Sequence, residues 1–226
     1  VDIILNPSAS PFTFHKFITR ERFVIDGSRS FSCSYVYTNL LGNESGRLIF
    51  DGDAMIASEG MLLASSPRFG YADYYITSAV IDTDLTRLSH AQIKSPIPAG
   101  NWKVMDTFNW PEAAPAYQVA ELEAFERGGY LKEEEFARAV CLALFDYLRK
   151  SRSQGFTVSL SGGADSCACV ALCGLMIRLA DESIGLEAFK KKLGYIKKIQ
   201  SENTVEGIAK QLIHSIYQGT ENSSAD

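Results

Sequence analysis

The chain has 226 residues, of which 46% are apolar and 22% are charged, an ordinary composition for a soluble globular protein. Its formal net charge is −5, which argues against general nucleic-acid binding, because that function depends on clustered Lys and Arg. No apolar run approaches the length of a membrane span.

The first ninety or so residues predict a series of strands. The opening "VDIILNPSASP" begins with the pattern of a buried strand, Val1 to Leu5, and lacks both an initiator methionine and a signal peptide. We therefore expect an interior segment of a longer polypeptide. "GNESG" and "FDGD" are typical of turns. Further strands are expected at 32–39, 46–50, 61–65 and 74–82.

A proline-rich stretch then interrupts the pattern. "SPIPAGNWKVMDTFNWPEAAPAY" holds four of the seven prolines, too many for a helix or a continuous strand. We place the domain junction there. The predicted organisation is a first domain at 1–95, a junction at 96–127 and a second domain at 128–226.

Helical periodicity follows the junction. "EEEFARAVCLALFDYLRK" (133–150) places Phe136, Val140, Leu144 and Leu148 on one face, with acidic residues first and basic residues last, as the helix dipole favours. Further helical segments are expected at 184–199, which is Lys-rich and amphipathic, and at 204–213.

Between those helices lies "FTVSLSGGADSCACVAL" (156–172), a strand that ends in two glycines and reopens as a helix. Such a turn makes an anion site, because backbone N–H groups and the helix N-terminus face the ligand. Asp165 would repel a bare phosphate, so we expect Mg²⁺ between them. The pattern is neither G-x-x-x-x-G-K-[ST] nor G-x-G-x-x-G. The alternative is a plain turn capped by Asp165 or Ser166, which would need neither paired glycines nor two serines.

"SLSGGADS" resembles the pyrophosphate-binding loop of the N-type ATP pyrophosphatases, whose pattern is S-G-G-x-D-S. Members of that superfamily adenylate a carboxylate or carbonyl oxygen and release pyrophosphate. The resemblance implies ATP and Mg²⁺ as cofactors, with Asp165 as the metal ligand. It implies these ATP-binding residues: Ser159, Leu160, Ser161, Gly162, Gly163, Ala164, Asp165 and Ser166.

The flanking segments narrow the resemblance. "NPSASPFTFHK" (6–16), "YVYTNLLGNESGRLIFDGDAMIASEGMLLA" (35–64) and "SAVIDTDL" (78–85) resemble the later half of a nitrilase-type amidohydrolase domain. "YQGTENSS" (217–224) resembles a segment of NAD synthetases. This layout is that of the glutamine-dependent NAD⁺ synthetases. It implies an α/β fold in which the later half of a nitrilase-type αββα sandwich precedes the start of a Rossmann-like parallel α/β domain.

The resemblance implies a ligase with two sites. One hydrolyses glutamine, and the other uses ATP to adenylate the nicotinate carboxylate of deamido-NAD⁺, from which ammonia displaces AMP. It also implies a cytoplasmic homo-oligomer, in agreement with five cysteines that do not form a disulfide framework. No nucleic-acid or membrane partner is expected.

Individual residues follow from the same resemblance. Ser10 and Lys16 fall in the segment that lines the glutamine pocket, although a turn serine and a surface lysine would look alike. The glutaminase Glu, Lys and Cys precede this segment in the family, so we expect none of them here and no activity from the segment alone. Cys33 is instead interpreted as a buried strand cysteine. Lower-ranked synthetase-site candidates are Thr220, Asn222 and Ser223.

Other polar clusters receive structural interpretations. The two acids of "FDGD" (50–53) are expected in a polar turn rather than a metal site. Cys167, Cys169 and Cys173 are expected to be small residues that pack a helix against a sheet. The lysines of 190–198 are interpreted as a solvated helix face.

Two other functions stay open at this point. The loop alone would also suit another N-type ATP pyrophosphatase, a tRNA-modifying enzyme or other amidating ligase. A tRNA-modifying enzyme predicts a basic RNA-binding surface, which the net charge does not support. A non-catalytic nucleotide-binding module is the second alternative.

Overall fold

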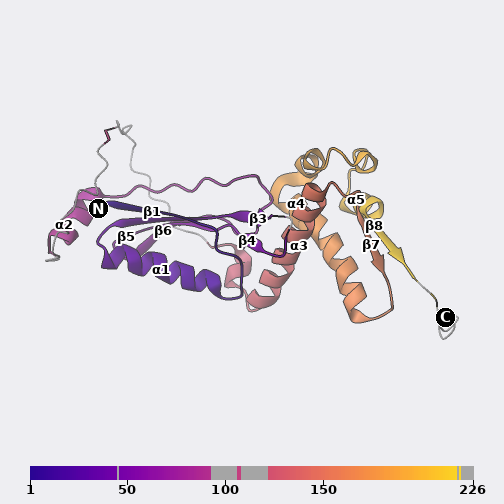
Figure 1. The fold of residues 1–226 in the computed structure, drawn as a ribbon, viewed down its shortest axis with the longest axis horizontal. Coiled ribbons are helices and arrows are strands. Elements are labelled where there is room, and N and C mark those ends of the chain that lie inside the picture. The colour runs from indigo at the N-terminus through magenta and orange to yellow at the C-terminus, as the bar shows by residue number, and fades with distance from the viewer. Residues whose placement is uncertain (45, 93–105, 108–121, 218, 220–226) are drawn as a thin grey trace.

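The computed structural model describes residues 1–44, 46–92, 106–107, 122–217 and 219. Most of the predicted junction, together with Thr220, Asn222 and Ser223, lies outside these residues. Figure 1 shows a sheet covered by a helix in one part of the molecule and a mainly helical part beside it, with α3 where the two meet. Within the described part of the chain, no helix is both long and apolar enough to cross a membrane.

The first part is built on a four-stranded sheet of order β1-β2-β5-β6. Strand β1 (Ile3–Ser8) is parallel to β2 (Ser34–Asn39), and β5 (Ala54–Ser58) and β6 (Met61–Ser65) continue the sheet in antiparallel pairs. A parallel pair needs a crossover connection, which helix α1 (Lys16–Ser30) supplies. The predicted strands at 32–39 and 61–65 are confirmed, to within two residues at their ends.

Helix α1 is a finding that the sequence reading missed. It packs on the sheet, and Phe17, Arg20, Val24 and Gly27 are buried at helical spacing. An arginine and a glycine on the inner face broke the apolar stripe by which an amphipathic helix is recognised. The core it forms with the sheet contains Phe17, Val24, Tyr35, Tyr37, Met55 and Ala57.

Other expectations about the first part were also wrong. The opening strand forms from Ile3, but it lies at the sheet edge, and Val1 and Leu5 are 82% and 73% exposed rather than buried. Residues 74–82 alternate like a strand yet belong to no sheet among the described residues. Strand β5, with the sequence "AMIAS", and helix α2 (Thr83–Gln92) were not expected.

A short hairpin leads from the sheet toward the helical part. Strands β3 (Leu41–Asn43) and β4 (Ile49–Asp51) pair antiparallel, so only the end of the predicted strand 46–50 is confirmed. The backbone N–H of Asn43 donates to Asp146 Oδ2 of α3 at 2.7 Å. The hairpin is therefore fixed directly to the first helix of the second part.

Helix α3 (Leu131–Ser151) confirms the predicted helix but buries two faces instead of one. Phe136 of the predicted face is 52% exposed. One buried stripe packs against the first part, and the other packs against α4, where Cys141 Sγ donates to the Leu172 carbonyl at 3.4 Å. The first stripe consists of Glu135, Ala139, Leu142 and Asp146, and the second of Cys141, Phe145 and Leu148.

The second part also contains a two-stranded parallel sheet. Its strands are β7 (Phe156–Ser159) and β8 (Ile213–Ile216), and they are linked through α4 (Ala164–Lys192), the 3₁₀ turn η2 (Lys197–Ile199) and α5 (Val205–Leu212). The fold class is thus confirmed as mixed α/β with parallel strands. A nitrilase-type half followed by a Rossmann-like half stays a prediction.

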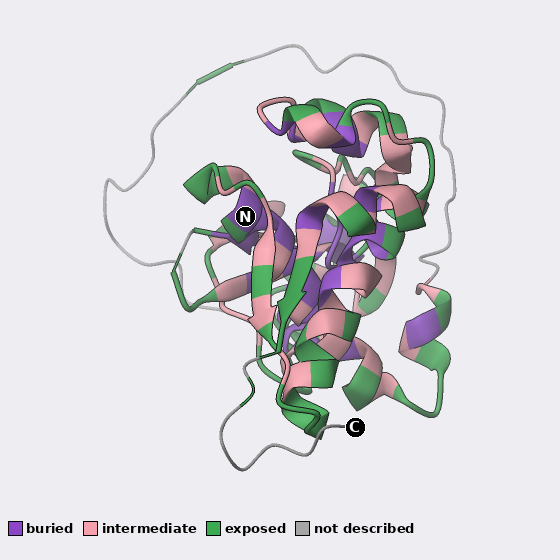
Figure 2. Ribbon diagram, turned by 90° about the vertical axis from the view of Figure 1, so that its right-hand side faces the viewer, coloured by how far each residue is buried: buried purple, intermediate pink, exposed green. Residues whose placement is uncertain are grey.

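Three expectations about α4 and its surroundings need correction. The first part of the predicted amphipathic helix 184–199 is the end of α4, which follows a kink at Gly185 (φ +78°), and separate turns come after it. Lys190 is buried, not solvated, and its Nζ donates to the Glu202 carbonyl at 3.0 Å. Cys173 is buried as expected, but Cys167 and Cys169 are exposed. Figure 2 shows the buried residues on the inner sides of the helices and of the sheet.

Gly155, which precedes β7, allows a sharp test of this packing. Its φ is +150°, and a Cβ there would collide with the Leu212 carbonyl oxygen. Gly155→Ala should therefore lower the free energy of unfolding by roughly 1–3 kcal/mol, measured by urea denaturation. Gly174→Ala is the matched control, because that Cβ meets nothing and the helix gains about 0.5–1 kcal/mol. Equal effects of the two changes would contradict the close approach of Gly155 to the end of α5.

Candidate functional site

The Ser-Gly-Gly loop lies where β7 gives way to α4, as the sequence predicts. The Leu160 N–H donates to the Ile216 carbonyl at 2.8 Å, which holds the end of β7 against β8. Gly162 has a φ of +80°, a conformation that glycine adopts without strain. Ser159 ends the strand, and all residues from Ser161 to Asp165 are exposed. The loop is thus open to a ligand at the N-terminus of a long helix.

The serines shape the loop rather than cap the helix. Ser166 Oγ donates to the Gly163 carbonyl at 3.1 Å and accepts from the Ser161 N–H at 3.3 Å. Gly163 is the N-cap residue, and no side chain caps it. Among the described residues, neither Asp165 nor Ser166 forms a side-chain N-cap hydrogen bond, although Ser166 does bond within the turn. Helix geometry leaves the first-turn N–H groups without intrahelical acceptors, as an anion site requires.

The exposed carboxylate of Asp165 suits the metal that the sequence predicts. No cluster of three or more His, Cys, Asp or Glu side chains able to hold a metal occurs among the described residues. Mg²⁺ is commonly held by only one or two carboxylates together with substrate phosphates. One acidic residue beside a phosphate-binding loop is enough for that mode of binding. These residues therefore fit Mg²⁺ bound together with a nucleotide, and not a metal held by protein ligands alone.

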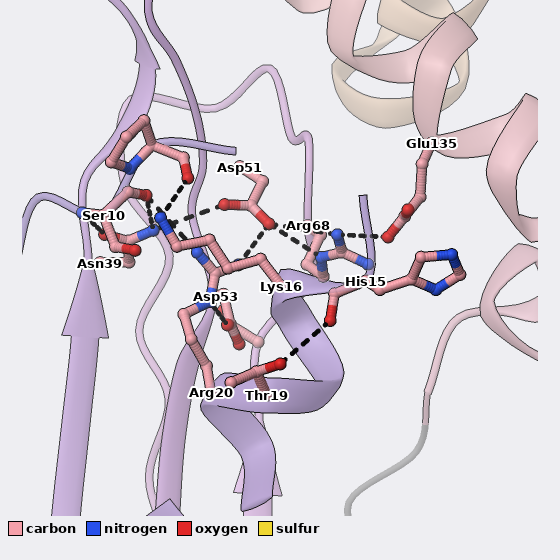
Figure 3. A network of polar contacts seen from close by, with 12 residues as sticks. Ser10, His15, Lys16, Thr19, Arg20, Asn39, Asp51, Asp53, Arg68 and Glu135 are labelled. Carbon is pink, nitrogen blue, oxygen red and sulfur yellow. Dashed lines mark hydrogen bonds and ion pairs between the residues drawn. The ribbon is translucent and has the colours of Figure 1, made fainter. Parts of the chain in front are cut away.

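The second predicted site lies in the segment after β1. The Ser10 N–H donates to Asn39 Oδ1 at 2.7 Å, and Asn39 Nδ2 donates back to the Ser10 carbonyl at 3.0 Å. Lys16, the first residue of α1, is half-buried and donates from Nζ to the Pro11 carbonyl at 3.0 Å. Ser10 and Lys16 therefore lie at the two ends of the segment between β1 and α1, here called the Ser10 turn, and Figure 3 shows both side chains. Lys16 is thus neither fully exposed nor fully buried, and its place in a glutamine pocket stays a prediction.

Beneath this turn lies a buried network of charges that sequence reasoning missed. Asp51 Oδ2 accepts from Arg20 of α1 and, at 3.1 Å, from Arg68, which follows β6. Arg68 also donates to Glu135 of α3 at 2.8 Å. Figure 3 shows this series of contacts running from the Ser10 turn to α3. "FDGD" forms the expected connection between β4 and β5, but both of its acids are buried.

Two carboxyl groups of the network, those of Asp53 and Glu126, have a raised pKa. Burial raises the pKa of Asp53 to about 7, against the opposing effect of Arg20. Burial likewise raises the pKa of Glu126 to about 7, although Arg68 opposes it. Arg20 Nε lies 3.1 Å from Asp53 Oδ2, but without the geometry of a hydrogen bond, and neither Asp53 oxygen has a hydrogen-bond partner among the described residues. Protonation of these two carboxyls, favoured below about pH 7, lowers the negative charge beside Arg20 and Arg68.

The buried cysteines do not have the properties of nucleophiles. Cys33 is fully buried, and burial raises the pKa of its thiol. Burial also raises the pKa of Cys141 to about 12. Because the thiolate is the reactive form, these thiols are unreactive near neutral pH. Cys33 is buried as expected, although it directly precedes strand β2 rather than lying in it.

Comparison with known proteins gives one consistent answer. A rice synthetase, "Glutamine-dependent NAD(+) synthetase" of Oryza sativa subsp. indica, is 29% identical over 99% of this chain and 32% of the rice protein. The enzyme of the same name from Saccharomyces cerevisiae is 27% identical over all of this chain and 34% of its own length. The chain thus spans about a third of the length of these curated relatives. No family model matches it.

Solved structures agree. A glutamine-dependent NAD(+) synthetase from Cytophaga hutchinsonii has a TM-score of 0.70 and 34% identity over 99% of this chain and 32% of that one. One from Acinetobacter baumannii, in complex with ADP, has a TM-score of 0.51 at 20% identity over 96% of this chain and 34% of that one, and shows the fold alone. The proteins that the chain resembles are therefore ligases. In particular, its resemblance to part of the glutamine-dependent NAD⁺ synthetases is confirmed over almost the whole chain.

Asp53 gives the buried network a measurable pH dependence. Its pKa is about 7 in the folded state and about 4 in an unfolded chain, so the folded state binds the extra proton and stability falls as pH rises from about 4 to about 7. Asp53→Asn removes the titration and keeps a residue that tolerates the φ of +83°. The variant should therefore gain stability relative to the parent across that range.

Urea denaturation between pH 5 and pH 8 measures this difference, which should grow by at most about 1.4 kcal/mol per pH unit and level off above about pH 7. The control is Asp26→Asn, which makes the same change at an exposed position of α1. A difference between Asp53→Asn and the parent that does not change with pH would contradict the assignment.

Proposed function

We propose that this chain is part of a glutamine-dependent NAD⁺ synthetase. The reaction is the ATP-dependent amidation of deamido-NAD⁺ to NAD⁺ with ammonia released from glutamine. The nicotinate carboxylate attacks the α-phosphorus of ATP and pyrophosphate leaves; ammonia then attacks the adenylated carboxyl carbon, AMP leaves, and a proton is lost. The exposed S-G-G-x-D-S loop between a parallel strand and a helix carries the proposal.

The loop contributes binding and orientation of the pyrophosphate part of ATP. The N–H groups of the first turn of α4 and the Gly162–Gly163 backbone face the phosphates, and the helix dipole stabilises their charge. The hydroxyls of Ser161 and Ser166 already bond to each other and to the loop, so little ordering is needed on binding. When bound through Asp165 and the phosphates, Mg²⁺ would neutralise charge that develops on the leaving pyrophosphate.

The Ser10 turn would form part of the glutamine pocket. Lys16 presents an ammonium group at the start of α1, where it could pair with the α-carboxylate of glutamine. The described cysteines that are buried are unsuited to attack the glutamine amide, so the nucleophile is expected outside this chain and the segment alone is expected to be inactive. Ammonia must stay unprotonated to attack, which favours a path between the sites shielded from water.

The remaining features of the proposal follow from the resemblance and the composition. Unpaired cysteines agree with a cytoplasmic enzyme, and a homo-oligomer is expected. Neither a nucleic acid nor a membrane is expected as a partner. Another ATP pyrophosphatase, including a tRNA-modifying enzyme or other amidating ligase, and a non-catalytic nucleotide module are not favoured, because the matched relatives bear one name across the whole chain.

Asp165→Asn tests the ATP loop in the complete synthetase polypeptide. The change keeps size and removes charge, and synthesis of NAD⁺ from free ammonia should fall by about a hundredfold, with a raised Mg²⁺ requirement. Asp181→Asn, near the middle of the same helix, is the control and should leave synthesis unchanged. Full synthesis by Asp165→Asn with an unaltered Mg²⁺ requirement would refute the metal role.

Lys16→Ala tests the glutamine pocket independently. The KM for glutamine should rise at least about tenfold, as expected for the loss of a charge-assisted hydrogen bond, while synthesis from free ammonia is spared. Arg22→Ala, at an exposed position of α1, provides the control. An equal loss with both nitrogen sources would mean that Lys16 acts only through its bond to the Pro11 carbonyl.

A further inference from the structure

Arg68 is the side chain through which the two parts of the molecule share a buried charge. Its side chain is 1% exposed and lies among carboxylates from three separate segments. It contacts Asp51 of β4 at 3.1 Å, Glu126 of η1 (Ala124–Arg127) at 3.5 Å and Glu135 of α3 at 2.8 Å. A planar guanidinium group can serve several acceptors in fixed directions, which a lysine ammonium cannot do in the same way.

Aromatic rings fix the plane of this guanidinium group. The Arg68 Cζ atom lies 4.6 Å from the centre of the Phe17 ring and 4.9 Å from that of Phe69. The backbone is held as well, because Phe69 N–H donates to the Asp51 carbonyl at 2.8 Å. The group is therefore preorganised, and movement of one of its carboxylate partners is transmitted to the others.

On one side, the contacts lead to the Ser10 turn. Asp51 is shared between Arg68 and Arg20, and the Arg20 Nη1 atom lies 3.5 Å from the Ser10 carbonyl. Asn39 Nδ2 reaches both Asp51 Oδ1, at 3.4 Å, and the Ser10 carbonyl, at 3.0 Å. The position of the Asp51 carboxylate therefore helps to set the backbone position of Ser10.

On the other side, the contacts lead to the ATP loop. Glu135 lies on the stripe of α3 that faces the first part, and a second stripe of α3 packs on α4 through Cys141 and Phe145. Helix α4 begins at the Ser-Gly-Gly loop. A helix that is packed on both faces moves as a unit, so displacement of α4 would reach Glu135 and, through it, Arg68.

We propose that Arg68 is a positioning residue that couples the two sites, so that occupation of the ATP loop changes the placement of the Ser10 turn through Glu135, Arg68 and Asp51. This inference rests on the proposed function. A buried ion-pair network need not add stability, because such pairs can often be replaced by apolar residues without loss. Linkage requires that the effect be reciprocal for binding, so ligands at either site bias the other.

The test uses the complete synthetase polypeptide with Glu135→Gln and Arg68→Lys. Both variants nearly keep the buried volume. Glu135→Gln weakens the contact on the α3 side, and Arg68→Lys weakens the contacts on both sides. Glutamine hydrolysis is measured with and without ATP and deamido-NAD⁺, and their ratio is the coupling. We expect the coupling to fall at least about fivefold in each variant, while NAD⁺ synthesis from free ammonia stays within about twofold. The double variant should lose no more coupling than the larger single loss, because both changes interrupt one path.

Glu134→Gln is the matched control. It makes the same change one residue earlier on α3, where the glutamate pairs with Arg138 and not with Arg68. Unchanged coupling in Glu135→Gln, or an equal loss of ammonia-dependent synthesis, would overturn the proposal and leave Arg68 a structural role. If a variant does not melt cooperatively, its Arg68 contact serves folding, and the proposal is likewise overturned. Failure of the parent enzyme to make NAD⁺ from ammonia would refute the proposed function itself.

Discussion

Helix α3 must satisfy two different neighbours, and much of the molecule is arranged around that requirement. One stripe of the helix is apolar in its middle and acidic at both ends, where Glu135 receives Arg68 and Asp146 receives the Asn43 backbone N–H. The other stripe is apolar and packs on α4. Because a buried carboxylate without a partner is costly, the two acids fix how the first part docks on the helix. The interface between the first part and α3 is thus specified by charge as well as by apolar contact.

Local patterns accounted for the parts of the structure that local physics determines. The glycine pair between a strand and a helix, and the 3.6-residue period of α3, depend on neighbouring residues only, and both were predicted. The alternating pattern at 74–82 did not suffice for a strand, because a ladder needs a partner strand that the segment's own sequence does not specify. Helix α1 was missed because its inner face carries Arg20, which pairs with Asp51 elsewhere in the chain.

The candidate sites show the same division. The ATP loop is contiguous, so its residues could be named from the sequence, and Ser10 and Lys16 could be named from a contiguous resemblance. The charged network beneath the Ser10 turn joins residues separated by 17, 31 and 67 positions, and no spacing rule connects such residues. The one available signal was "FDGD", whose second acid, Asp53, lies in a positive-φ position. The roles of the ATP-loop residues and the domain limits stay predictions.

The charged interface between the first part and α3 has a consequence for how the chain folds. Glu135 and Arg68 are 67 residues apart, and Asn43 and Asp146 are 103 apart, so both contacts require large loops to close first. Until these loops close, α3 exposes acids that the folded structure buries. Partial docking would bury these acids without their hydrogen-bond partners. Intermediates with a half-formed junction are therefore penalised. The two parts are expected to complete their folding together, in one cooperative transition, rather than as independent domains.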